Sequence, residues 1–408
     1  MNRRRFLGMS CAGAASTLVG CDLDFRAGMF NACHAQLPNA LAQSALVRGA
    51  WQGLDARNVW DVHCHVFGNG DSGSGLWLNP ATERIWQPQQ YLQRLFYLNA
   101  GCVHDSPGKV DASVVDRLRN QCEALPDGVH LLLFAFDWAR DEAGRPLKER
   151  STFYVPDAYA ADLHARFSER FEWAASIHPD AADALDRLDA AAAMGARAIK
   201  WLPSAQNIDP ASSRCDRFYR KLTKSRLPLI THAGDERAVR GHAEDLGNPL
   251  LLRRALDAGV RVVIAHCASL GVGRDLDRGA SGPAVPNFDL FTRLMDTPAY
   301  RTNLYADISA ITQGNRMEVV ATLLAREDWH PRLLNGSDYP LPGILPLISL
   351  DALAGRGLLD AGAIAPLREI REHNALLFDM VLKRSLQSNG ARFSRSVFET
   401  RPFFVATA

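Results

Sequence analysis

Six residues that can bind a metal ion or move a proton stand at or next to the ends of short apolar runs. They are His63, His65, Lys200, His232, His266 and Asp338. Imidazole nitrogens and carboxylate oxygens are the ligands that zinc and similar divalent ions prefer in proteins. In His63-Cys64-His65 the two imidazoles are two residues apart, so an extended strand places both on one face. The pattern indicates a metal site, provided that the fold brings these run ends together.

The same residue types would supply hydrolytic chemistry. A mononuclear zinc site with three imidazoles keeps an open position for water and lowers the pKa of that water to about 7. Asp338 is acidic enough to stay ionised beside a cation, so it can accept a proton from water and return it to a leaving group. His266 can hydrogen-bond the attacking oxygen or a polarised carbonyl.

Eight segments with the composition of buried strands must position these residues. From Asn58 onward, β-branched or apolar runs alternate with helical patterns, which is typical of βα units around a parallel sheet. The predicted strands lie at 59–63, 129–136, 171–177, 196–202, 227–232, 260–266, 303–309 and 332–338. Helical patterns are expected at 180–194, 213–224, 249–258 and 317–326. The predicted fold class is α/β, a (β/α)8 TIM barrel, whose strand ends converge on one mouth where catalytic groups collect.

Segments outside the strand pattern set the predicted domain organisation. The interval between the first two strands is too long for one helix and loop, so we expect an inserted lid subdomain at about 68–128. The barrel is predicted over 56–385, with a C-terminal extension at 386–408. Residues 21–55 show no sustained periodicity and are interpreted as a tether.

The first 20 residues have the layout of an export signal. Three arginines at 3–5 precede a short acid-free stretch that is too weakly apolar for a membrane span. NRRRFLG resembles a twin-arginine signal, and LVGC at 18–21 resembles a lipobox whose Cys21 is acylated. We expect a periplasmic lipoprotein anchored to the bacterial inner membrane; a fortuitous apolar N-terminus is the simpler alternative.

Composition limits the classes of partner. With 47% apolar and 22% charged residues the chain is globular, and 46 Lys and Arg balance 45 Asp and Glu. No basic stripe favours nucleic acid, so we expect a small-molecule substrate and membrane contact only through the lipid anchor, with a homo-oligomer left open. The six cysteines after Cys21 show no disulfide framework in their spacing. Cys64 and Cys267 are expected to be buried thiols that face away from the adjacent histidines.

Together these motifs resemble the amidohydrolase superfamily, and more narrowly the branch that contains aminocarboxymuconate-semialdehyde decarboxylase. The resemblance runs from about Asn58 to Lys383 and rests on DVHCH at 61–65, IHP at 177–179, AIKWLP at 198–203, THAG at 231–234, IAHC at 264–267, GSDYP at 336–340 and HNALLF at 373–378. It implies a zinc site whose ligands are His63, His65, His232 and Asp338. It also implies that His266 orients or activates the water and that Asp338 relays its proton.

Lys200 leaves two metal arrangements open. In binuclear members of the superfamily a carboxylated lysine at this strand end bridges two ions, and the residue matching His266 binds the second ion. The same lysine fits the branch motif, whose members are commonly mononuclear, and an amine there can bind a substrate oxygen. We expect one zinc ion, with another divalent metal or a binuclear site as the alternative.

Four further residues are candidates for substrate contact. Arg237 and Arg240 follow His232 in its loop, where they can clamp a carboxylate or be solvated and paired with neighbouring acids. His178 can touch the substrate or hold the barrel rim by a hydrogen bond. Trp201 follows Lys200 in its strand and departs from the family pattern, which leaves the substrate open.

Supporting roles are expected for other acids and histidines. Asp307 is a candidate partner of a ligand histidine, whereas Asp61 is interpreted as a buried structural acid. Structural or solvated roles are expected for His34, His104, His130, His164, His242, His330 and His373.

Three functions are compatible with such a site. A zinc-dependent hydrolase that cleaves an ester, lactone or amide bond follows most directly from activated water and a carboxylate relay, and we expect its substrate to carry an anionic group. A lyase that removes CO2 from an unsaturated or aromatic acid on the same scaffold is the alternative. An inactive ligand-binding lipoprotein is the third, and the full ligand set argues against it.

Overall fold

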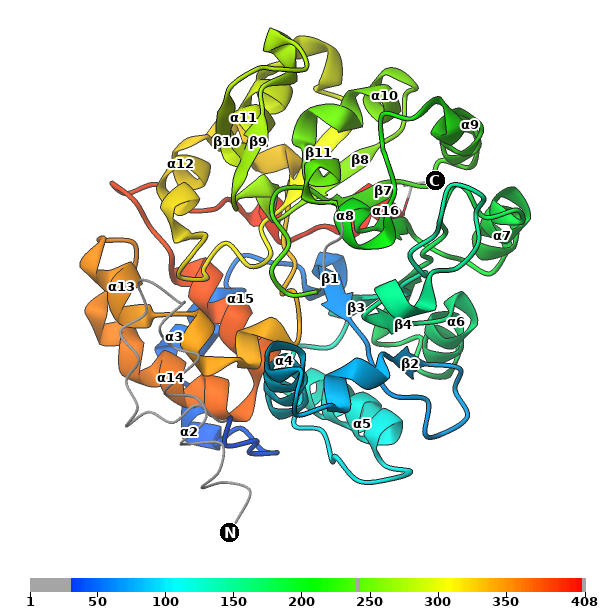
Figure 1. Ribbon diagram of the computed structural model, residues 1–408. Helices are drawn as coiled ribbons and strands as arrows, with labels where there is room; N and C mark the ends of the chain where they lie inside the picture. The colour runs from blue at the N-terminus through cyan, green and yellow to red at the C-terminus, as the bar shows by residue number, and fades with distance from the viewer. Residues whose placement is uncertain (1–30, 240–242, 406–408) are drawn as a thin grey trace.

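A ring of eight parallel strands forms the centre of the computed structural model, which describes residues 31–239 and 243–405 (Figure 1). The strands are β1 (Trp60–His65), β3 (His130–Phe134), β5 (Phe171–Ala174), β6 (Ile199–Trp201), β7 (Leu229–His232), β8 (Val262–Ala265), β11 (Leu304–Asp307) and β12 (Leu333–Leu334). Nearly all their residues are buried, which explains why they read as continuous apolar runs rather than as alternating ones. Each overlaps one of the predicted strand segments.

Two sheets make up the ring. One has the strand order β1-β3-β5 and the other β12-β11-β8-β7-β6, and every neighbouring pair is parallel. A parallel bridge between Ala175 and Ile199 joins β5 to β6, and another between Cys64 and Tyr339 joins β1 to the segment after β12. The predicted α/β class and TIM-barrel architecture are therefore confirmed.

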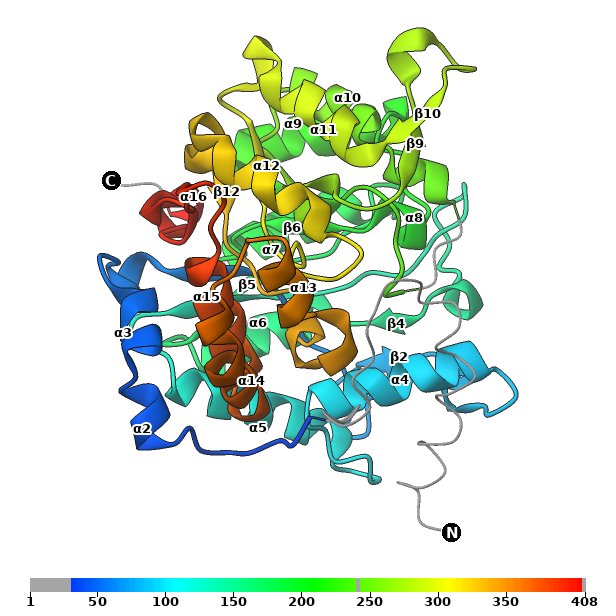
Figure 2. The same cartoon turned by 90° about the vertical axis from the view of Figure 1, so that its left-hand side faces the viewer.

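Helices cover the outside of the strands (Figures 1 and 2). They include α6 (Asp157–Arg166), α7 (Ala184–Ala193), α8 (Pro203–Gln206), α9 (Asp216–Ser225), α10 (Arg253–Asp257), α11 (Asn287–Asp296), α12 (Val320–Ala325), α13 (Leu350–Gly355), α14 (Ile364–His373) and α15 (Ala375–Ser385). In α9, Phe218, Tyr219 and Leu222 are buried on one face, which is the spacing of an amphipathic helix. The four predicted helical patterns overlap α7, α9, α10 and α12.

The C-terminal residues close one end of the barrel. Phe404 of α16 (Arg401–Phe404) stacks on Trp60 with ring centroids 5.7 Å apart. Phe404 packs there against inward-facing strand residues, among them Val62, Leu132 and Ile230. Thr400 Oγ1 donates a 2.8 Å hydrogen bond to the Trp60 carbonyl oxygen. The predicted C-terminal extension is thus part of the core.

The insertion after β1 has two parts. Helix α5 (Val110–Glu123) packs beside α15, where Asn374 Nδ2 donates to the Gln121 carbonyl oxygen at 2.7 Å. Helix α4 (Pro88–Ala100) contributes side chains to the cavity at the barrel mouth. Two short antiparallel pairs stand beside the barrel. In one, β2 (Trp77–Leu78) pairs with β4 (Phe153–Tyr154), which follows β3 in the chain, and the other is a hairpin of β9 (Val272–Arg274) and β10 (Ala284–Pro286).

Residues 31–55 differ from the tether that we expected from the sequence. They form α2 (Asn39–Ala42) and α3 (Ala45–Trp51), and Val47 and Ala50 are buried against the core. A disulfide joins Cys33 to Cys102 of the insertion. Cysteine spacing did not reveal this pair, because its members are 69 residues apart and lie in two segments without a strong pattern.

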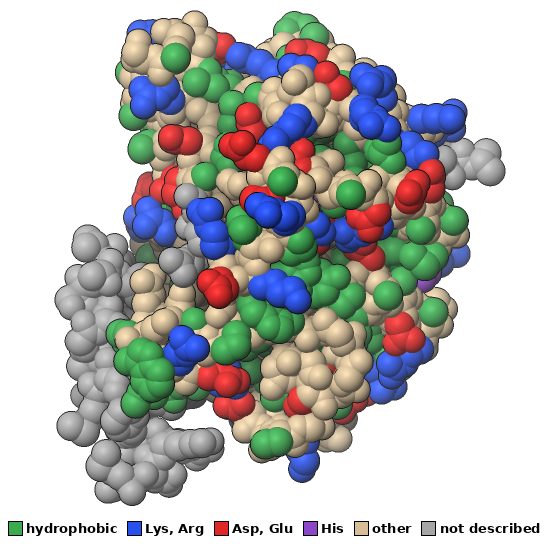
Figure 3. All heavy atoms as spheres, turned by 45° about the vertical axis from the view of Figure 1, so that its right-hand side comes forward, with side chains coloured by type: hydrophobic (Ala, Val, Ile, Leu, Met, Phe, Trp, Pro, Cys, Tyr) green, Lys and Arg blue, Asp and Glu red, His purple; other side chains and the backbone are tan. Residues whose placement is uncertain are grey.

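The predicted signal peptide, Cys21 and residues 22–30 lie outside the described residues. Within the described ranges, no helix has both the length and the apolar character that a membrane span requires. Side chains of both charges are interspersed over the face shown in Figure 3.

Candidate metal centre and active site

The strand ends bring the predicted residues into one cavity at the barrel mouth. The cavity is lined, among others, by His63, His65, Lys200, His232, His266 and Asp338. Because side chains alternate along β1, Cys64 points away from the cavity and is fully buried in the core. Cys267 is likewise buried, and burial raises the pKa of both thiols well above the ordinary value. Both cysteines are therefore core residues, as the alternation predicts.

Asp338 is the centre of the polar cluster. Its Oδ1 lies 3.4 Å from His63 Nε2 and 3.2 Å from His65 Nε2, and its Oδ2 lies 3.8 Å from His266 Nε2. His63, His65 and Asp338 each offer a ligand atom within 4.8 Å of the others. Burial raises the pKa of Asp338, but the neighbouring imidazoles outweigh this effect and hold the pKa well below its ordinary value. The carboxylate is therefore ionised.

Asp307 orients the first of these imidazoles. Its Oδ2 accepts a 2.9 Å hydrogen bond from His63 Nδ1, which leaves Nε2 facing Asp338. Asp307 Oδ1 also accepts from the backbone N–H groups of His266 at 2.9 Å and Ser309 at 3.0 Å. Although His63, His266 and Asp307 also form a close group, these hydrogen bonds occupy the Asp307 oxygens. We therefore assign Asp307 to positioning, the role considered from the sequence.

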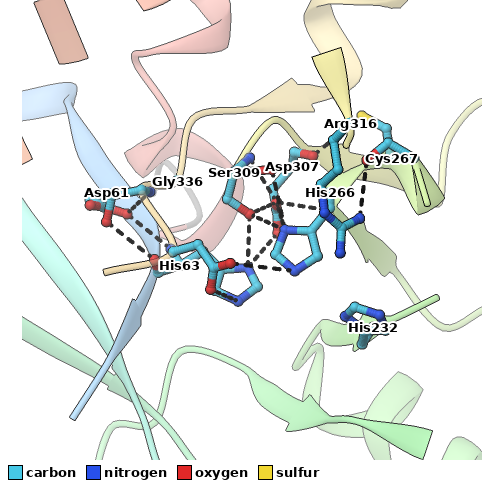
Figure 4. A network of polar contacts seen from close by, with 12 residues as sticks. Asp61, His63, His232, His266, Cys267, Asp307, Ser309, Arg316 and Gly336 are labelled. Atoms are coloured by element: carbon cyan, nitrogen blue, oxygen red, sulfur yellow. Dashed lines mark hydrogen bonds and ion pairs between the residues drawn. The ribbon is translucent and has the colours of Figure 1, made fainter. Parts of the chain in front are cut away.

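His266 is held in a similar way. Its Nδ1 lies 2.7 Å from Ser309 Oγ (Figure 4). Its Nε2 therefore faces the cavity and Asp338. Residues 266–268 have positive φ values, which turns the chain sharply at the end of β8 (φ 54°, 51° and 48°). Burial lowers the pKa of His266 well below its ordinary value, so the imidazole is neutral.

His232 lines the same cavity but does not belong to the group of His63, His65 and Asp338. Its ring centroid is 5.2 Å from that of His266. Its Nδ1 lies 3.4 Å from Glu236 Oε2, and its Nε2 lies 3.3 Å from the Asp235 carbonyl oxygen. The structure thus brings together three of the four residues in the implied zinc shell and places the fourth next to His266.

Lys200 lies on the metal side of the cavity. Its Nζ is 3.3 Å from His63 Nε2 and 4.7 Å from the ring centroid of Phe134. The residue is almost completely buried, and burial lowers its pKa to about 8. This position is compatible both with a contact to a substrate oxygen and with a second metal site.

Two candidate substrate residues lie outside the cavity. Trp201 is fully buried behind the strand, because alternation turns it away from the mouth when Lys200 faces inward. Its Nε1 donates to the Ile177 carbonyl oxygen at 2.8 Å. His178 is also fully buried, with Nε2 3.1 Å from the Gln206 carbonyl oxygen, and its Nδ1 accepts from Asp180 N. We therefore correct the assignment of Trp201 from substrate contact to structural support, and His178 has the structural hydrogen bond that was its alternative.

The two candidate arginines of the loop after β7 differ in what the structure describes. Arg237 reaches the rim of the cavity, but its side chain is 71% exposed and pairs with Asp235 at 2.9 Å. That pairing matches the alternative of a surface ion pair. Arg240 lies outside the described residues.

Sequence reasoning missed several residues of the cavity wall. Glu236 is buried beside His232 and accepts from the backbone N–H of Val239 at 3.0 Å. Gln93 and Tyr97 of α4 both donate to the carbonyl oxygen of Ala238, which joins the insertion to the loop after β7. Glu236 follows His232 by four residues, and this spacing could have indicated that it lines the cavity. The local sequence of α4 contains no signal that its residues reach the cavity.

One comparison with known proteins identifies a family. The Amidohydrolase family model matches residues 60–343. No curated protein matches the sequence significantly.

Among solved structures, an uncharacterised TIM-barrel protein from Bordetella bronchiseptica is similar at 16% identity and a TM-score of 0.45, over 76% of this chain and 98% of that one. A putative 2-pyrone-4,6-dicarboxylic acid hydrolase from Pseudomonas putida is similar at 16% identity and a TM-score of 0.43, over 84% and 97%. A 2,6-dihydroxybenzoate decarboxylase from Rhizobium is similar at 13% identity and a TM-score of 0.39, over 79% and 98%. Because the family model spans more than half of the sequence, from β1 past Asp338, this chain belongs to the amidohydrolase family.

Proposed function

We propose that this protein is a divalent-metal-dependent hydrolase, with zinc as the expected ion, that cleaves an ester, lactone or amide bond in a small anionic molecule. The observation that carries the proposal is the position of Asp338. This ionised carboxylate lies 3.2–3.8 Å from three imidazoles at the floor of a cavity.

The protonation states of the cluster fit a divalent ion. Metal ligands must be deprotonated, which means neutral imidazoles and an ionised carboxylate. Burial, together with Lys200, lowers the pKa of His63 to about 4, so this imidazole is neutral at pH 7. His63, His65 and Asp338 would hold the ion, with His232 at the adjoining strand end. When bound, such an ion lowers the pKa of a water molecule and polarises a substrate carbonyl.

The surrounding residues supply proton transfer and orientation. Asp338 Oδ1 faces the two imidazoles of β1, and its Oδ2 faces His266. Asp338 therefore accepts the proton of the attacking water at Oδ2 and delivers it to the leaving group. His266 presents Nε2 to the same space and hydrogen-bonds the reacting oxygen, while Ser309 fixes its other nitrogen.

One observation favours the lyase as a second candidate. Much of the cavity wall is apolar, and it includes Val66, Phe67, Leu78, Phe153 and Leu270. A carboxylate in such surroundings is destabilised relative to neutral CO2, which would assist its loss. Hydrolysis remains the first proposal because it uses the ionised Asp338 directly.

An assay that follows two products tests the proposal. Zinc-loaded protein is supplied with lactones, esters, amides and aromatic carboxylates, and acid release and CO2 release are measured in parallel. Acid release that disappears in Asp338→Asn is expected. Asp189→Asn, which removes an exposed carboxylate on α7, serves as the control and should retain activity. CO2 release without acid release would favour the lyase, and turnover of no compound would contradict both candidates.

We also propose that the protein is exported and anchored by a lipid at Cys21. The arginine-rich leader supports this proposal, and so does the Cys33–Cys102 disulfide, since disulfides persist in oxidising compartments. Replacing Arg4 and Arg5 together by lysine should retain the precursor in the cytoplasm, and Cys21→Ser should release the protein from the membrane fraction. Normal export of the double-lysine variant, or a wild-type protein found free of membrane, would contradict the respective step.

A further inference from the structure

Four cationic side chains line the cavity in the described parts of the chain, and two of the three arginines are already paired. Arg94 of α4 contacts both carboxylate oxygens of Asp105, at 2.7 Å and 3.1 Å. Arg237 pairs with Asp235 at the exposed rim. Both guanidinium groups therefore already have a carboxylate counter-ion within the chain.

Arg316 is different. It follows β11 in the loop that leads to α12, lines the cavity and is 6% exposed. Its Nη1 donates to Ser269 Oγ at 3.2 Å, whereas its buried Nε has no hydrogen-bond partner. No carboxylate oxygen of the described chain lies within 4.0 Å of its guanidinium, which stands beside His266 (Figure 4).

A buried guanidinium without a direct counter-ion is costly, so this arrangement favours an anion from outside the chain. Glu236 and Asp338 are the nearby acids of the cavity, and both already have partners. Glu236 accepts from backbone N–H groups and faces His232, and Asp338 lies among the imidazoles. Nη2 of Arg316 therefore remains for a ligand in the cavity, next to the buried and unpaired Nε.

We propose that Arg316 binds the carboxylate group of the substrate and so orients the molecule over the metal centre. The inference rests on the proposed function and names the substrate class, a small carboxylic acid. A guanidinium edge matches one carboxylate through two parallel hydrogen bonds. Glu236 and Asp338 in the same cavity disfavour a dianion such as phosphate. This assignment replaces Arg237 as the anion-binding residue.

Binding of a matched pair of probes tests the proposal independently of turnover. Benzoate and benzamide have nearly the same shape and differ in charge, and calorimetry measures their affinities for the zinc-loaded protein and for the metal-free protein. The metal-free measurement removes the contribution of a carboxylate–zinc contact. Wild-type protein should bind benzoate at least 10-fold more tightly than benzamide in both forms.

Arg316→Met should weaken benzoate binding by about 10- to 100-fold and leave benzamide binding unchanged, because only the charge-assisted contact is lost. Arg316→Lys should retain part of the preference for benzoate over benzamide, which would show that the position tolerates substitution. Arg237→Met should change the affinity for neither probe. Equal affinities of the two probes in wild-type protein, or a preference that survives Arg316→Met or disappears in Arg237→Met, would overturn the proposal. A protein that keeps the preference for benzoate but turns over no substrate would contradict the proposed function alone.

Discussion

The cavity has two halves that are built differently. The metal half stands on strand ends, where His63 is buried between Asp307, its hydrogen-bond partner, and Asp338, whose carboxylate lies 3.4 Å away. The opposite half stands on α4 and on the loops after β7 and β11, and its side chains range from buried Arg316 to the largely exposed Arg237. Rigid strand ends hold chemistry in place, whereas loops can vary without disturbing it. Under the proposed function, reaction and recognition are therefore separable.

The two halves also differ in how completely their polar groups are satisfied. On the metal side, hydrogen bonds use Nδ1 of His63, Nδ1 of His266 and both carboxylate oxygens of Asp307. On the loop side Gln90 Oε1, Arg94 Nε and Arg316 Nε are buried without a partner. Buried polar atoms are normally hydrogen-bonded, so the loop half has the character of a surface that is completed by a ligand.

The largest effect is expected where the metal half is broken at its centre. Asp338→Asn removes the charge among the imidazoles and the proton acceptor together, so kcat should fall by about 10²- to 10⁴-fold and zinc should be lost. Steady-state kinetics and elemental analysis measure the two effects, and circular dichroism checks the fold. A variant that keeps its metal and its kcat would remove Asp338 from both roles.

A smaller effect is expected from a residue that acts through a ligand. Asp307→Asn keeps the shape of the contact to His63 Nδ1 but removes its charge, so zinc affinity should fall by about 10- to 100-fold. Competition with a chelator measures the affinity. Ser309→Ala, which removes a neutral partner of His266, is the matched comparison and should weaken zinc binding less. The reverse order would assign the orienting role to Ser309.

The contrast between the halves also explains what the sequence could predict. Strand periodicity placed His63, His266 and Asp338 at one mouth, because parallel strands of a barrel end on the same side. The same periodicity places Trp201 outside the cavity, because adjacent residues of a strand face opposite ways. We nevertheless predicted a substrate contact for Trp201, because it belongs to the motif AIKWLP. Loop residues such as Arg316 carry no periodic signal, so their arrival at the cavity depends on backbone conformation that spacing does not specify.

The contact between the insertion and the barrel should affect substrate binding more than chemistry. Tyr97→Phe removes the hydroxyl that donates to the Ala238 carbonyl, and loss of one hydrogen bond should raise KM by about 2- to 10-fold with kcat unchanged. Tyr91→Phe on the same helix, outside the cavity lining, is the control. A fall in kcat with constant KM would place Tyr97 in the chemical step instead.

The smallest effect on activity is expected at the disulfide, which does not line the cavity. Replacing Cys33 and Cys102 together by serine should lower the free energy of unfolding by about 2–4 kcal/mol, because the bond restricts the unfolded chain between residues 69 apart in sequence. Urea denaturation measures this loss, and kcat should stay unchanged. Unaltered stability would show that residues 31–55 are held by packing alone.

The central claim is that His63, His65 and Asp338 form a metal centre at the barrel mouth. Anomalous diffraction recorded on both sides of the zinc absorption edge, from crystals of active protein, tests it directly. We predict one strong peak between these three side chains, next to His232. A second peak beside Lys200 and His266 would make the centre binuclear. Active crystals without a metal peak at the cavity floor would contradict the account.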